Sequence, residues 1–153
     1  MTRLATIGYE GATVQGFLHA LRTEGVELLV DVRALAMSRR PGFAKTRLAG
    51  NLADAGIEYL HLRGLGTPAD GRAAARAGRH AELKEIYCDH LSTPVAQTDL
   101  ETLIGIVESG RRVALLCFEA DASHCHRSLI VSEMSQRLAL DVNHLVPIED
   151  DES

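Results

Sequence analysis

The residues best suited to chemistry lie at one junction between a predicted strand and a predicted helix. The apolar run 113–118 predicts a buried strand, Glu119 follows it in a short polar loop, and Cys125, His126 and Arg127 open the next helix. Unpaired backbone N–H groups and the positive end of the helix dipole attract anions at such a position and lower the pKa of a thiol. We therefore predict a functional site here, with Cys125 as the candidate nucleophile.

The same stretch admits two other interpretations. Cys125 is also of a size to be a small buried residue that packs the start of the helix, and Cys117 is expected to face the core. A metal site would draw on residues of ligand type, namely Cys117, Glu119, His124, Cys125 and His126. Their spacing matches no standard zinc pattern, and adjacent side chains on a helix point about 100° apart. No metal is predicted.

Two further strand ends carry polar residues. The aliphatic run 26–32 is typical of a parallel strand covered on both faces, and Asp31 and Arg33 lie at its carboxyl end. The first strand, 4–8, ends just before Tyr9. In open α/β sheets the ligand crevice lies outside the carboxyl ends of the strands, so these groups are expected to converge on the residues of the first junction. Asp31 either orients Arg33 for a ligand or forms a structural ion pair with it.

These residues require an α/β framework to bring them together. Strand, loop and helix alternate from the start of the chain, with predicted helices over 14–24 and 44–55 and a third strand over 57–62. This order predicts a single domain with a mostly parallel, doubly wound sheet of about five strands flanked by helices. A last strand is expected over 142–146.

A helical excursion is predicted between the third and fourth strands. Residues 69–79 are rich in alanine and arginine with little apolar bulk, and 82–91 has a clearer helical period. The stretch Thr98 to Glu101 has the pattern of a capping box, which predicts that the next helix begins there.

Length and composition are those of an ordinary globular protein. The chain has 153 residues, 46% hydrophobic and 24% charged, so we expect one domain over 1–148 and an acidic tail over 149–153. The tail holds four of the 21 acidic residues and accounts for most of the net charge of −5. Three cysteines without a C-x-x-C pair and an N-terminus without a long apolar run predict a cytoplasmic protein. No stretch approaches the ~20 apolar residues that would span a bilayer.

Several short motifs together resemble a prokaryotic family, the domain of unknown function DUF488. They are Thr6-Ile-Gly8, Asp31-Val-Arg33, Ser38-Arg39, Gly56-Ile-Glu-Tyr59 with His61-Leu and Leu65-Gly66, and Leu115-Leu-Cys117-x-Glu119 followed by Cys125-His-Arg127-Ser128. The resemblance covers most of the chain and implies a compact α/β domain, without implying a reaction. Many relatives have His-Ser where Tyr9-Glu10 stands here, and a proline in the second loop where this chain has Ala36-Met37.

The preferred hypothesis is an enzyme or ligand-binding domain for a phosphorylated or otherwise anionic substrate. Asp31, Arg33, Glu119, Cys125 and Arg127 are expected to line one crevice, with Arg33 and Arg127 sharing an anion. The proposed catalytic residues are Cys125, Asp31 and Glu119, and the proposed binding residues are Tyr9, Arg33, Ser38, Arg39, His126 and Arg127. The Cys-x5-Arg loop of cysteine phosphatases is absent, as are dinucleotide and P-loop motifs.

The alternative is a non-enzymatic nucleic-acid-binding or regulatory module. It would use the basic residues in and just after the second loop, which are Arg33, Arg39, Arg40, Lys45 and Arg47. An aromatic content of 4% offers few rings for bases to stack on. The sequence predicts no particular cofactor or oligomeric state.

Overall fold

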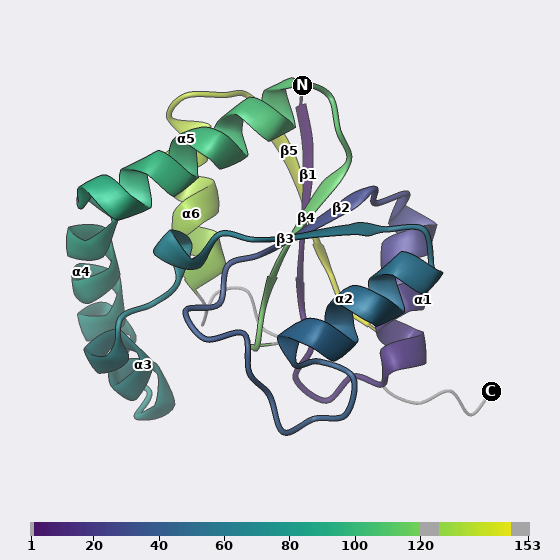
Figure 1. The fold of residues 1–153 in the computed structure, drawn as a ribbon. Helices are drawn as coiled ribbons and strands as arrows, with labels where there is room; N and C mark the ends of the chain where they lie inside the picture. The colour runs from purple at the N-terminus through teal and green to yellow at the C-terminus, as the bar shows by residue number, and fades with distance from the viewer. Residues whose placement is uncertain (1, 120–125, 148–153) are drawn as a thin grey trace.

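The fold is known from a computed structural model, which describes residues 2–119 and 126–147. It is an α/β domain with a parallel sheet flanked by helices (Figure 1), as the sequence predicts. The elements are β1 (Thr2–Gly8), α1 (Val14–Glu24), β2 (Leu28–Asp31), α2 (Lys45–Asp54), β3 (Glu58–His61), the 3-10 turn η1 (Arg63–Leu65), α3 (Ala69–Arg76), α4 (His80–Leu91), α5 (Pro94–Glu108), β4 (Val113–Cys117), α6 (His126–Ser135) and β5 (Leu140–Leu145). The predicted acidic tail lies outside the described residues.

The five strands of this sheet follow the order β3-β2-β4-β1-β5, and every neighbouring pair is parallel. All carboxyl ends therefore meet at one edge. The register places Gly8 beside Cys117, and Asp31 beside both Leu116 and His61. The segments that follow β1, β2 and β4 are thus neighbours in space, although β1 ends at Gly8 and β4 only at Cys117.

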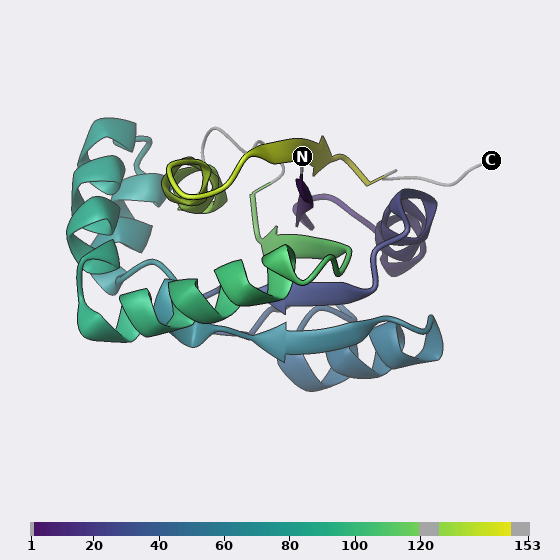
Figure 2. The same ribbon diagram turned by 90° about the horizontal axis from the view of Figure 1, so that it is seen from above.

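The sheet lies between helices on both of its faces (Figure 2), and a separate hydrophobic core fills each side. One contains Phe17 and Leu21 of α1 with Leu48 and Leu52 of α2, and the other contains residues of α4, α5 and α6 such as Ile130. Alternate residues of β2 and β4 point into each core, as expected for strands that are buried on both faces.

The predicted excursion is formed by η1, α3 and α4, residues 63–91, and lies at one end of the molecule (Figure 1). Within the excursion, α4 is bonded to η1 by two side chains. Tyr87 donates a hydrogen bond of 2.6 Å to the carbonyl of Leu65, and His90 Nε2 donates one of 2.7 Å to the carbonyl of Gly64. These bonds fix the turn from which α3 starts.

The predicted start of α5 is wrong by one turn. The helix begins at Pro94 with Thr93 as N-cap, whose side chain accepts a hydrogen bond from the Ala96 amide. Thr98 lies inside the helix, where its hydroxyl donates to the carbonyl of Pro94. Proline at the first helical position fits because its missing N–H would have no intrahelical partner there.

None of the helices in the described part of the chain combines the length and the apolar character needed to span a bilayer.

Candidate functional site

A buried ion pair lies at the end of β2. The carboxylate of Asp31, which has no solvent exposure, accepts hydrogen bonds from Arg33 Nε at 2.9 Å and Arg33 Nη2 at 2.7 Å. It also accepts the Arg33 amide at 3.1 Å and the Tyr59 hydroxyl at 2.6 Å. This bidentate pairing fixes the plane of the guanidinium. Asp31 therefore holds Arg33 in place and does not itself reach open space.

The outer side of the Arg33 guanidinium is fixed by the loops that follow β1 and β2. Its Nη1 donates to the carbonyl of Phe43 at 2.8 Å and to the hydroxyl of Tyr9 at 3.3 Å. Burial alone would lower the pKa of Arg33, but the hydrogen bonds and opposite charge of Asp31 outweigh it and raise this pKa above its ordinary value. Arg33 is thus a permanent, rigid cation with hydrogen bonds from Nε, Nη1 and Nη2.

His126 connects the first turn of α6 to β2. Its Nε2 donates a hydrogen bond of 2.7 Å to the carbonyl of Val32, and its ring packs 5.2 Å from the ring of Tyr87. Burial lowers the pKa of His126 to about 4, with the Val32 bond opposing that effect. The ring is therefore neutral at pH 7, and its lone pair lies on Nδ1 because Nε2 carries the proton.

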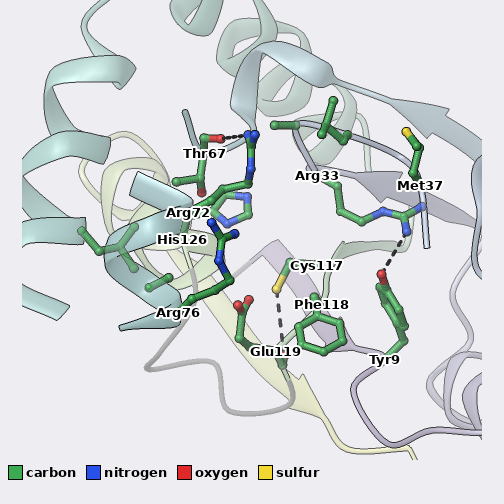
Figure 3. Close-up of a pocket in the computed structure, with 14 residues that line it drawn as sticks. Tyr9, Arg33, Met37, Thr67, Arg72, Arg76, Cys117, Phe118, Glu119 and His126 are labelled. Atoms are coloured by element: carbon green, nitrogen blue, oxygen red, sulfur yellow. Dashed lines mark hydrogen bonds between the residues drawn. The ribbon is translucent and has the colours of Figure 1, made fainter. Parts of the chain in front are cut away.

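A cavity of about 350 Å³ opens at this edge of the sheet (Figure 3). Its walls combine the segments after β1, β2 and β4 with α3 and the start of α6. The lining residues are Tyr9, Arg33, Ala34, Leu35, Met37, Thr67, Arg72, Ala75, Arg76, Leu83, Cys117, Phe118, Glu119 and His126. This is the position that the topology of an open parallel sheet favours for a ligand.

Helix α3 contributes two arginines to the cavity, which the sequence analysis did not select. Arg72 and Arg76 are one helical turn apart, so both side chains leave the same face of α3 (Figure 3). Arg72 Nη1 donates to the carbonyl of Thr67 at 2.8 Å. Neither arginine forms an ion pair with an acidic residue of the described chain. The feature of the sequence that could have indicated them is the i, i+4 spacing of the two arginines, which places both on one face of a helix.

Arg127 is fully buried and is not among the residues that line the cavity. It lies beneath the end of β1, where its Nη1 would be 3.0 Å from a Cβ placed on Gly8. The same Cβ would be 1.8 Å from the carbonyl oxygen of Glu119, so only glycine fits between these groups. Of the two arginines expected to share an anion, only Arg33 faces this cavity.

Ser38 and Arg39 belong to the loop after β2 but do not line the cavity. The hydroxyl of Ser38 accepts the amide of Arg40 at 3.0 Å, which stabilises a local turn. Arg39 is exposed to solvent. From this loop it is Ala34, Leu35 and Met37 that reach the cavity.

The structure thus brings together four of the predicted site residues, which are Tyr9, Arg33, Glu119 and His126. Asp31 lies behind Arg33, and the predicted nucleophile Cys125 lies outside the described residues. Cys117 is buried at the end of β4 and lines the cavity. No group of three His, Cys, Asp or Glu side chains in residues 2–119 and 126–147 has the arrangement of a metal site.

Comparisons with known proteins give one match. Residues 13–134 fit the family model described as domain of unknown function DUF488, a span that includes α1, the excursion and most of α6. No curated protein and no solved structure matches the chain. Since the family model covers most of the sequence, the chain belongs to the DUF488 family.

Proposed function

We propose that this protein binds a small anionic molecule, such as a phosphorylated metabolite, in the cavity at the carboxyl edge of the sheet. The observation that carries the proposal is the presence of Arg72 and Arg76 at the cavity without acidic partners in the described chain. A guanidinium binds phosphate or carboxylate oxygens through paired N–H donors, which makes arginine the preferred residue for such ligands.

The charge balance of the cavity supports this proposal. Asp31 offsets the charge of Arg33 from behind, and His126 is neutral at pH 7. The remaining charged groups of the lining are Arg72, Arg76 and the carboxylate of Glu119, which leaves an excess of positive charge.

Titration with inorganic phosphate tests the proposal. Amide NMR spectra should show saturable shifts at millimolar phosphate, confined to α3 and the loop after β2. The double variant Arg72→Gln/Arg76→Gln should weaken this binding about tenfold or more. The matched control is Arg79→Gln/Arg137→Gln, which removes the same charge from two exposed surface ion pairs. Equal weakening in both double variants would contradict a defined anion site.

An enzymatic version of the proposal would use Cys125 as the nucleophile, because this residue precedes the cavity residue His126 in the sequence. It predicts that the protein releases phosphate from 4-nitrophenyl phosphate and that Cys125→Ser abolishes this release. Release at the same rate by the Cys125→Ser variant would exclude this role.

The nucleic-acid alternative would use a different surface. Arg39, Lys45 and Arg47 are exposed and form no ion pair with a described acidic residue. The guanidinium of Arg40, by contrast, donates to the carbonyl of Ala12. This alternative predicts DNA or RNA binding that falls steeply with salt, because phosphate contacts release counterions. Lack of binding in low salt would exclude it.

A further inference from the structure

The cavity has an apolar side that the proposed anion does not use. The described chain exposes five large hydrophobic side chains, namely Leu35, Met37, Val95, Phe118 and Val146. Leu35, Met37 and Phe118 all line this cavity, with exposed fractions of 55%, 74% and 43%. We call these three residues the apolar lip. Exposed apolar side chains that gather at one cavity mark a binding surface.

The lip is supported by stacked aromatic rings. Phe118 packs edge-on against Tyr9 at a centroid distance of 5.3 Å, and Tyr9 stacks on Phe43 at 4.7 Å with an interplanar angle of 11°. Phe43 in turn contacts Phe17 in the core at 5.1 Å. The chain has three Phe and three Tyr, so all of its phenylalanines belong to this one series. The ring of Phe118 is therefore held by the core while part of it stays exposed to the cavity.

The apolar side and the cationic side of the cavity are formed by different elements. The Tyr9 hydroxyl accepts a hydrogen bond from Arg33 Nη1, so the polar end of this ring is engaged and its apolar part packs against Phe118. The arginines of α3 approach from another element (Figure 3). A ligand that contacts both α3 and the lip needs an anionic end and an apolar end.

From this arrangement we infer that the ligand is an amphipathic acid, with one anionic group on a planar apolar body of one or two rings. The inference rests on the proposed function and extends it. The volume of about 350 Å³ lies near the lower end of the range for small-molecule sites and suits a body of that size. The anionic group binds Arg72 and Arg76, and the planar body packs against Phe118 and Met37.

Three probes separate this inference from the proposed function. Inorganic phosphate carries only the anion, 1-naphthol carries only the rings, and 1-naphthyl phosphate carries both. We expect 1-naphthyl phosphate to bind about tenfold more tightly than either partial probe, as measured by calorimetry or by NMR titration. If phosphate and 1-naphthyl phosphate bind equally, the anion site stands and the amphipathic ligand is excluded. If none of the three binds, both proposals fail.

Single substitutions test whether the rings of 1-naphthyl phosphate lie against the apolar lip. Met37→Ser should weaken 1-naphthyl phosphate several-fold more than inorganic phosphate, and Met37 is exposed enough that the fold does not depend on it. Val146→Ser is the control, because Val146 is equally exposed and does not line the cavity. If Met37→Ser changes the sedimentation of the protein but not its affinity for 1-naphthyl phosphate, the lip is a contact between copies and the inference is overturned.

Discussion

The imidazole Nε2 of His126 lies 2.7 Å from the carbonyl oxygen of Val32, so the first turn of α6 is bonded to the end of β2. The two residues are 94 positions apart in the chain. The carbonyl of the next residue, Arg33, accepts a similar bond of 2.7 Å from His61 Nε2. Two histidines thus fix consecutive peptide groups just before the loop that borders the cavity.

The burial of His126 predicts a loss of stability in mild acid. In the unfolded chain this histidine titrates near 6.5, whereas burial lowers its pKa in the fold to about 4. The unfolded state therefore binds a proton that the folded state does not, and stability falls as the pH drops from about 6.5 to 4. The expected loss from this group is about 3 kcal/mol, measured by urea denaturation across this pH window.

The variant His126→Asn isolates this contribution. Its free energy of unfolding should be lower at pH 7 and should depend less on pH between 6.5 and 4 than that of the original protein. His19→Asn is the matched control for the loss of an imidazole, since His19 is exposed on α1. An unchanged pH dependence in His126→Asn would contradict the assignment.

Asp31→Asn should be strongly destabilising. The substitution keeps the shape of the side chain but leaves the buried guanidinium of Arg33 without its counter-charge. Removing one partner of a buried ion pair typically lowers stability by about 3–5 kcal/mol. Glu58→Gln is the matched control, because it breaks the exposed pair with Arg111 and should change stability by less than about 1 kcal/mol. Similar urea midpoints for the two variants would refute this account of Asp31.

Gly8→Ala and Gly50→Ala should have opposite effects on thermal stability. A methyl group at position 8 would overlap the backbone of Glu119, and overpacking of this kind costs about 1–3 kcal/mol. Position 50 lies within α2 with no atom near its Cβ direction, so alanine should stabilise the helix by about 1 kcal/mol. Calorimetric melting of both variants checks the pair, and a stabilised Gly8→Ala would be inconsistent with the position of Glu119.

Thr93→Ala and Thr98→Ala test where α5 begins. Thr93 caps the helix, so its loss should lower stability by about 1 kcal/mol. Thr98 is exposed inside the helix, where alanine has the higher propensity and should be neutral or slightly stabilising. The opposite ranking in denaturant melts would place the helix start at the later position.

The fold was accessible from the sequence because each strand is an apolar run that ends in polar residues. Tyr9, Arg33 and Glu119 follow three such runs, and parallel strands bring their carboxyl ends to one edge. An ion pair between Asp31 and Arg33 was one of the two interpretations that this pattern allowed. The pattern does not reveal the hydrogen bond that Asp31 accepts from Tyr59, because that bond joins β2 to the neighbouring strand β3.

Two features of α3 and α5 escaped the sequence analysis for identifiable reasons. Arg72 and Arg76 lie in an alanine-rich helix without a strong apolar period, so nothing in the local pattern indicated which face would meet the cavity. In α5 the stretch from Thr98 to Glu101 imitates a capping box, while the true start was signalled by Thr93 before Pro94. The proline was the more reliable signal, because its geometry restricts it to the first turn.

The two arginines of α3 belong to the excursion and not to the alternating strands and helices that build the sheet. Substitutions in α3 can therefore change the charge of the cavity while every strand residue stays the same. Glutamates at positions 72 and 76 would reverse the preference of this wall from anions to cations, while Arg33 and its buried partner stay in place. In this fold the sheet edge that holds Arg33 can stay constant while the residues of α3 that face the cavity are exchanged.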